Sequence, residues 1–261
     1  MDYFTKVETP PTQDLSWNIP ELKRGIVNVI GGNIQNFRTI IKISEFLTTN
    51  YPIESVRTIL PDALKPKLPS LPNLSFLAST DSGSFADEAG LRTAIDSADF
   101  SLIIGDLSKN NLTGQAITSA CQNSARPLLI TRDSVDLIVN HSPSSLLMNQ
   151  NIVFLASMPS LQKLLRSVYY PKMLLLSQSL IQVADVLHKF TLSYPTTVIT
   201  LHSNQILIAK NGEVKAVPLA KSGYLPMTFW GGEFAAKVVA LNLYNPNNTM
   251  DAIIAAIFQQ I

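Results

Sequence analysis

From residue 25 to about residue 195, short apolar segments of strand length alternate with longer stretches whose apolar residues recur every three or four positions. Strands are expected at residues 25–30, 56–60, 74–78, 100–104, 127–131 and 152–155. Helices are expected after Asn33, which would be an N-cap, and at residues 86–98, 113–123, 161–167 and 172–192. This alternation predicts a parallel sheet with helices on both faces, because parallel strands need helix-length crossover connections.

The last third of the chain has a different pattern. Strand-like residues 197–201 and 205–209 flank the triplet 202–204, and Asn211-Gly212 predicts a tight turn into a third strand at 214–217. Two helices are expected at the end, at residues 232–244 and 249–260. The prediction is an α/β fold of three layers, α/β/α, with a mainly parallel central sheet and an antiparallel hairpin at one edge.

The first 20 residues differ from the rest in composition. Pro10, Pro11 and Pro20 stand among scattered polar residues, which indicates an extended arm that either wraps the domain or mediates assembly. Residues 21–261 contain no repeat and no linker, so we expect them to form a single domain. The apolar last helix is a candidate interface element or, alternatively, ordinary core.

Composition excludes several classes of protein. Hydrophobic residues are 46% of the chain, and Lys plus Arg total 20 against 19 Asp plus Glu, so neither nucleic acid nor a membrane surface is an expected partner. Cys121 is the single cysteine, and His141, His188 and His202 have no neighbours at metal-ligand spacing, so neither a disulfide nor a metal site is expected. The N-terminus lacks a signal pattern and no apolar run reaches the ~18 residues of a membrane span, so we expect a cytoplasmic protein.

Two pairs of glycines stand where a helix is expected to begin. Gly31-Gly32 follows the first strand, where open parallel sheets bind ligands, although a tight strand-to-helix turn explains the pair equally well. Gly231-Gly232-Glu233 could let a backbone approach an anion, with the carboxylate as a general base, and simple helix capping is the competing interpretation.

Several segments carry a resemblance to a known family. They are VNVIGGN (27–33), ADFSLIIGDLS (98–108), PLLITRD (127–133), FLASMPS (154–160), ITLHSNQILIAKNG (199–212) and FWGGEFAAK (229–237). In order and hydrophobic pattern, more than in identities, roughly residues 22–260 resemble the NAD(P)H-hydrate dehydratase, carbohydrate-kinase-like branch of the ribokinase superfamily. The resemblance implies a ribokinase-like fold, ADP or ATP, an NAD(P)H-type ligand, Mg²⁺ only if the reaction is a kinase reaction, and a homo-oligomer.

The same resemblance implies a set of site residues. Glu233 would be the catalytic base. The nucleotide-binding residues would be Trp230, Gly231, Gly232, His202, Ser203 and Asn204. The substrate-binding residues would be Gly31, Gly32, Asn33, Asp106, Asp133 and Met158.

Five motifs depart from the family's pattern, the last of them at two positions. Glu233 stands where the family has an aspartate, and Trp230 where it has a glycine. The other departures are Leu201-His202 for a Lys-Gly pair, Gly105-Asp106-Leu107 for a Pro-Gly turn, Thr131 for an aspartate, and residues 158–161 for an HPGE turn. These losses fall on ligand-facing loops, which favours a catalytically degenerate homologue retained for binding or assembly.

The alternative is an active enzyme. It would be a nucleotide-dependent NAD(P)H-hydrate dehydratase or small-molecule kinase, with Glu233 as base and the amides of Gly231 and Gly232 stabilising negative charge. The position of Trp230 should separate the two hypotheses. An indole in the pocket would block phosphates, whereas an indole packed on the core would leave the site open.

Overall fold

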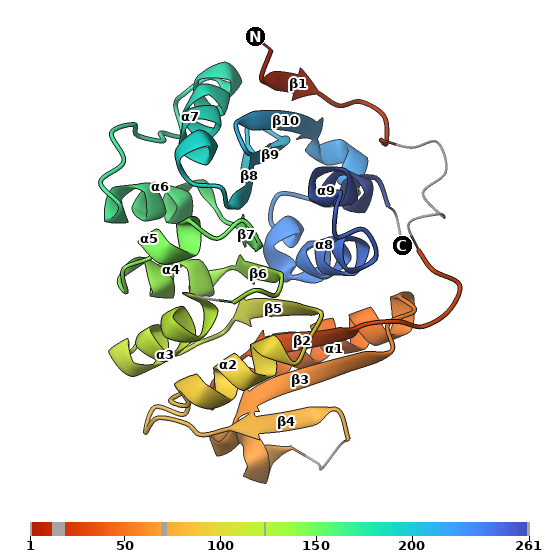
Figure 1. Ribbon diagram of the computed structural model, residues 1–261, viewed down its shortest axis with the longest axis vertical. Coiled ribbons are helices and arrows are strands. Elements are labelled where there is room, and N and C mark those ends of the chain that lie inside the picture. Colours follow the sequence, from red (N-terminus) through yellow and green to blue (C-terminus); the bar gives the residue numbers. More distant parts are fainter. Residues whose placement is uncertain (1, 12–18, 69–71, 123, 260–261) are drawn as a thin grey trace.

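The computed structural model describes residues 2–11, 19–68, 72–122 and 124–259 (Figure 1). Its ten-stranded sheet has the order β1-β10-β9-β8-β7-β6-β5-β2-β3-β4. The strands are β1 (Phe4–Lys6), β2 (Ile26–Gly31), β3 (Ser55–Pro61), β4 (Leu74–Leu77), β5 (Phe100–Gly105), β6 (Leu128–Thr131), β7 (Ile152–Leu155), β8 (Thr197–His202), β9 (Gln205–Lys210) and β10 (Glu213–Pro218). β9 is antiparallel to β8 and β10, and the other neighbouring strands are parallel. The predicted mainly parallel sheet with an antiparallel hairpin is confirmed.

Helices cover both faces of this sheet (Figure 1). One face carries α1 (Arg38–Asn50), α8 (Glu233–Tyr244) and α9 (Thr249–Phe258). The other carries α2 (Glu88–Asp96), α3 (Asn111–Gln122), α4 (Asp133–Val139), α5 (Ser144–Leu147), α6 (Met158–Ser167) and α7 (Leu180–Ser193). Short 3₁₀ helices connect the elements at η2 (Asp62–Lys67), η3 (Leu219–Ser222) and η4 (Thr228–Gly231). No helix in these described ranges is long and apolar enough to cross a bilayer.

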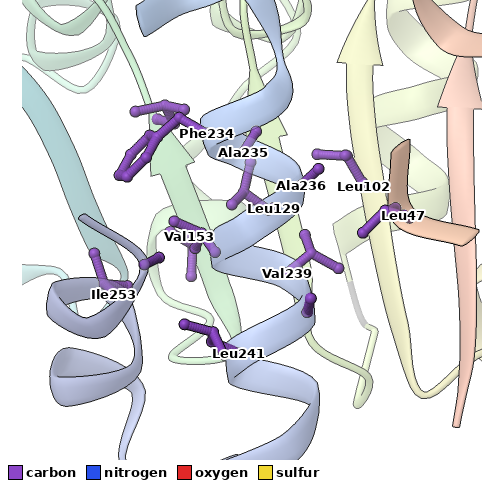
Figure 2. Packing of buried hydrophobic residues seen from close by; sticks show 14 of the residues in the cluster. Leu47, Leu102, Leu129, Val153, Phe234, Ala235, Ala236, Val239, Leu241 and Ile253 are labelled. Atoms are coloured by element: carbon purple, nitrogen blue, oxygen red, sulfur yellow. The ribbon is translucent and has the colours of Figure 1, made fainter. Parts of the chain in front are cut away.

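The helical layers explain why the central strands are buried and largely apolar. All six residues of β5 are buried, because a parallel strand covered on both faces has no solvent side. α8 is likewise apolar nearly all round, and Figure 2 shows it between sheet residues such as Leu129 and Ile253 of α9. The apolar residues of α9 are buried against the same core, so core packing accounts for the composition of this helix.

Two expected helix starts are wrong for local reasons. α1 begins at Arg38, because Asn33 does not cap it; the Asn33 Oδ1 instead accepts hydrogen bonds from the N–H groups of Gln35 (2.8 Å) and Asn36 (3.0 Å). α7 begins at Leu180 rather than at residue 172, because Ser179 and Gln182 form a reciprocal capping box.

Two further elements differ from the expectations. The short helices α4 and α5 were not expected from periodicity. Of the proposed arm at residues 1–20, residues 4–6 form β1 and pair in parallel with β10, while residues 1 and 12–18 lie outside the described residues.

Candidate ligand-binding site

The chain changes direction across the sheet at β2. It passes from β2 to β3 and β4 on one side, and then returns to β5 on the other side. In open α/β sheets, ligands bind at such a switch point, beyond the carboxyl ends of the strands. β2 and β5 end at Gly31 and Gly105, which lie opposite each other in the ladder. The structure therefore places Gly31, Gly32 and Asp106 at the switch point.

The first glycine pair is needed for strand packing. A Cβ atom on Gly31 would lie 2.5 Å from the carbonyl oxygen of Gly105. The N–H of Gly32 donates to that same oxygen at 2.9 Å. This contact is what the tight-turn interpretation requires, so Gly31 has a structural reason to be glycine whether or not a ligand binds.

The loop after β5 is held by residues from two other loops. The Asp133 carboxylate accepts hydrogen bonds from the backbone N–H groups of Asp106 (2.9 Å) and Leu107 (3.1 Å). Arg132 pairs with the Asp106 carboxylate at 2.8 Å, and Asn33 Nδ2 donates to the Asp106 carbonyl at 2.6 Å. Three predicted substrate-binding residues thus meet, but they bond to one another, and an anion would have to displace Asp133 to reach these amides.

Asp133 also forms part of the wall of a cavity of about 280 Å³. The other walls come from the start of α3, from α4 and from α6, and include Asn110, Asp136, His141 and Lys163. Lys163 is paired with Asp136 at 3.0 Å, so the cavity holds charges of both signs. Asp133 is one of the predicted substrate-binding residues, so this cavity borders the predicted site.

The second glycine pair begins α8 beside the end of β5. Gly232 is the N-cap residue with φ of 105°, and a Cβ there would lie 2.7 Å from Ile104 Cδ1. Gly231 has open space around it, with no atom within 4 Å of where a Cβ would be. No side chain caps α8, so no side chain occupies its first N–H groups, and the helix dipole favours an anion there.

Glu233 is the first residue of α8 and forms an ion pair with Lys42 of α1 at 3.0 Å. Its negative charge adds to burial in raising the pKa of Tyr224 to about 12. Lys237, one turn along α8, is buried and donates to the Gln259 carbonyl at 2.7 Å, while its ammonium lies 5.0 Å from the Tyr224 ring centre. The proposed base therefore has a cation as its direct partner, and a second buried cation follows it on the same helix.

Trp230 packs on the core. The ring is partly buried, and it meets the fully buried Phe229 edge to face, with centroids 5.0 Å apart. Of four cavities lined by described residues, none has Trp230, Gly231 or Glu233 in its wall. The indole thus belongs to the hydrophobic cluster beside α8, which is the arrangement expected to leave the helix start open.

The remaining predicted residues lie elsewhere. His202 is buried at the end of β8, and its Nε2 lies 2.8 Å from the Gln178 carbonyl oxygen. Ser203 and Asn204 form the turn between β8 and β9, both with positive φ. Met158 is buried in the core between the sheet and α6. Within the described ranges, no hydrogen bond or ion pair joins these four residues to residues 230–233.

Two residues of this edge were missed from sequence. Arg132 neutralises Asp106, and Lys42 neutralises Glu233. The sequence could have indicated Arg132, because this residue immediately precedes Asp133 at the end of a strand. No sequence pattern indicated Lys42, since its ion pair with Glu233 depends on how α1 and α8 pack. No group of three or more His, Cys, Asp or Glu that could hold a metal ion occurs in the part of the chain that the structure describes.

Comparisons with known proteins support this architecture. No protein-family model matches the sequence, and no curated protein is detectably similar to it. Among solved structures, a hypothetical protein from Streptococcus mutans is similar, with a TM-score of 0.63, 16% identity, and coverage of 96% of this chain and 83% of that one.

Two kinases of known structure are also similar. Anopheles gambiae adenosine kinase in complex with P1,P4-di(adenosine-5) tetraphosphate has a TM-score of 0.52 and 10% identity, covering 91% of each chain. An ADP complex of Bacillus subtilis pyridoxal kinase has a TM-score of 0.52 and 11% identity, covering 90% of this chain and 89% of that one. The chain therefore has a ribokinase-like α/β fold, the fold that these adenosine and pyridoxal kinases share.

Proposed function

We propose that this protein binds an adenine nucleotide by its phosphates at the start of α8, and that it is a catalytically degenerate ribokinase-like protein retained for binding. The observation that carries the proposal is the uncapped start of α8 at Gly231-Gly232, beside the carboxyl end of β5. Open space at Gly231 leaves room for a phosphate, and the N–H groups of the first turn supply donors.

The nucleotide part of the proposal is supported by the similar kinases. They were solved with P1,P4-di(adenosine-5) tetraphosphate and with ADP. A shared fold does not imply a shared function, so the ligand must be argued from this chain's own site. The uncapped helix start supplies that argument, because it offers donors and a positive dipole to an anion.

The loss of catalysis is supported by the partners of two carboxylates. Glu233 is paired with Lys42, and Asp133 occupies the amides of Asp106 and Leu107, which would otherwise be open to an anionic substrate group. Glu233 would have to break its ion pair with Lys42 before it could accept a proton, and the amides of the loop after β5 already have an acceptor within the protein. Both observations favour ligand binding without turnover.

Calorimetric titration with ADP, ATP and NADPH tests the binding. We expect micromolar affinity for at least one adenine nucleotide. Gly231→Asp should weaken it by at least about tenfold, or 1.4 kcal/mol, because the new carboxylate repels phosphate. Gly231→Ala is the matched control, since a methyl group there meets no atom within 4 Å, and it should bind as the wild type does. Failure of all three compounds to bind, or equal affinity in both variants, would contradict the proposal.

An active enzyme is the second candidate, and the packing of Trp230 on Phe229 favours it. Glu233 would then act as the base of an NAD(P)H-hydrate dehydratase or small-molecule kinase. Incubation with hydrated NADPH and ATP or ADP, followed by recovery of the nicotinamide absorbance, tests the first activity. Turnover that is lost in Glu233→Gln would replace the degenerate interpretation with the catalytic one.

A further inference from the structure

A groove that is separate from the switch point lies at the other end of the parallel strands, where β5 and β6 begin. Two cavities, of about 260 and 470 Å³, share Phe100, Pro127, Asn242 and Pro246 in their walls. We call their joint space the amino-edge groove, because Phe100 begins β5 and Pro127 precedes β6. It lies roughly 16 Å from Gly105 along β5, since each strand residue rises ~3.3 Å.

Lys210 is the charged residue in the wall of the smaller cavity. It ends β9, lines the smaller cavity and is partly buried. Its ammonium group makes no hydrogen bond and no ion pair with any described residue, whereas the ammonium of Lys215 on the next strand contacts both Glu213 and Asp251. Burial lowers the pKa of Lys210. A lysine that is partly removed from water without an acidic partner is costly, and an anionic ligand would reduce that cost.

Uncharged polar groups surround this lysine. Asn242 is 4% exposed, and its Nδ2 donates to the Val238 carbonyl at 2.8 Å. Gln150, Asn151 and Asn247 also line the cavity. Thr249 begins α9 at the same place, and no side chain caps this helix. The smaller cavity therefore combines a free cation, side-chain amides and a helix start, without any carboxylate in its wall.

The larger cavity adds an apolar surface. Its walls include Leu243, Tyr244 and Pro246, and the Arg24 guanidinium lies 5.5 Å from the Tyr244 ring centre. Asp99 is the carboxylate of this wall, and it is already within 3.7 Å of Arg126. The groove as a whole is positive, with an apolar half beside a polar half.

We propose that the amino-edge groove binds a small aromatic anion, whose phosphate or carboxylate contacts Lys210 and whose ring lies against Leu243 and Pro246. The supporting observation is that the only lysine in the groove's walls lacks an acidic partner among described residues, while an apolar surface adjoins it. This site does not depend on the nucleotide proposal, because the two lie at opposite ends of the strands.

Phenyl phosphate and benzoate are suitable probes, with inorganic phosphate and neutral benzyl alcohol as comparisons. In ¹⁵N-labelled full-length protein, we expect phenyl phosphate or benzoate to shift the amide signals of Lys210, Asn242, Asn247 and Thr249. Whichever of the two binds more tightly identifies the anionic group. Inorganic phosphate and benzyl alcohol should bind more weakly, because each offers only half of the proposed contacts.

Variants of Lys210 provide the decisive comparison. Lys210→Met should weaken binding of the better probe by at least about tenfold, since a charge-assisted contact is lost. Lys210→Arg should retain binding, and Lys6→Met, which removes an exposed lysine on β1, should not change it. Thermal unfolding of each variant verifies that it is folded.

Three results would overturn the groove proposal. They are no binding of either aromatic anion, unchanged affinity in Lys210→Met, and shifts confined to residues 231–235. The last result would place the anion at α8 instead and would leave the nucleotide proposal standing. Failure of the groove and failure of the nucleotide site are therefore distinguishable.

Discussion

The polar side chains at the two ends of the parallel strands differ in whether they have partners within the protein. At the carboxyl edge, Asp106, Asp133 and Arg132 bond to one another, and Glu233 has Lys42. At the amino edge, the ammonium group of Lys210 has no hydrogen-bond or ionic partner among the described residues. The motifs that attract attention in the sequence thus lie largely where the protein has satisfied its own charges. The position of glycines alone therefore does not show which polar groups are still free to bind a ligand.

The largest expected effect concerns the start of α8. Gly232→Ala should lower the free energy of unfolding by about 2–4 kcal/mol, because φ of 105° is unfavourable for alanine and its Cβ would meet Ile104. Gly231→Ala should change it by no more than about 0.5 kcal/mol. Urea unfolding measures both variants. If both variants lost the same free energy of unfolding, Gly232 would not be more tightly packed than Gly231.

The next effect tests how firmly the carboxyl edge is satisfied. Asp133→Ala should cost about 1.5–3 kcal/mol, since the amides of Asp106 and Leu107 lose a charged acceptor. Asp136→Ala, which breaks a more exposed pair with Lys163, should cost at most about 1 kcal/mol. The two midpoints of urea unfolding give the comparison. A smaller loss in Asp133→Ala would mean that water readily replaces this carboxylate.

A smaller effect is expected at the exposed ion pair of the same edge. Glu233→Gln should change the free energy of unfolding by at most about 1 kcal/mol, because Lys42 is largely in solvent. Thermal unfolding at low and high salt should show little difference from the wild type. A large loss would indicate that the pair organises the packing of α1 on α8, and would make Glu233 structural.

The smallest expected effect on stability is that of replacing Lys210 at the amino edge. Burial lowers the pKa of Lys210 from the ordinary value of 10.5, so the folded protein binds this proton less tightly than the unfolded chain does. The charged lysine therefore destabilises the fold below its folded-state pKa, and the penalty disappears as the pH rises toward 10.5. Lys210→Met should be at least as stable as the wild type at neutral pH, and its advantage should shrink in alkaline buffer. Urea titrations between neutral pH and pH 10.5 measure the difference in the free energy of unfolding between Lys210→Met and the wild type. If the variant's advantage grew with pH, the pKa of Lys210 would be raised by folding and not lowered.

Much of the fold was predictable because hydrophobic period is a local property of the chain. The segment at residues 100–104 is a buried strand, and residues 152–155 form β7 with the predicted bounds. Turn chemistry was equally informative at Asn211-Gly212, which joins β9 to β10. Helix starts were less predictable, since Asn33 and Ser179 use side-chain hydrogen bonds whose partners depend on the backbone path.

The candidate site was predictable only in part. The glycine pairs indicated two places at the carboxyl edge, and the structure brings Asn33, Asp106 and Asp133 together there. The same reasoning gave no sign that Met158 is buried in the core, because a single apolar residue after a strand fits either role. Partners such as Lys42 and Arg132 come from segments whose approach depends on the whole sheet order.

The sequence by itself determined the alternation of strands and helices, the hairpin near the end and the pair of glycines before α8, because each depends on near neighbours along the chain. Only the tertiary structure decided that Asp106 and Glu233 are paired and that the Lys210 ammonium has no ionic partner among the described residues. Asp133 reaches the loop after β5, and Lys210 ends beside the α8–α9 turn, across contacts between residues distant in sequence. Electrostatic partnership depends on distances of a few ångströms, and those distances exist only after the layers have packed.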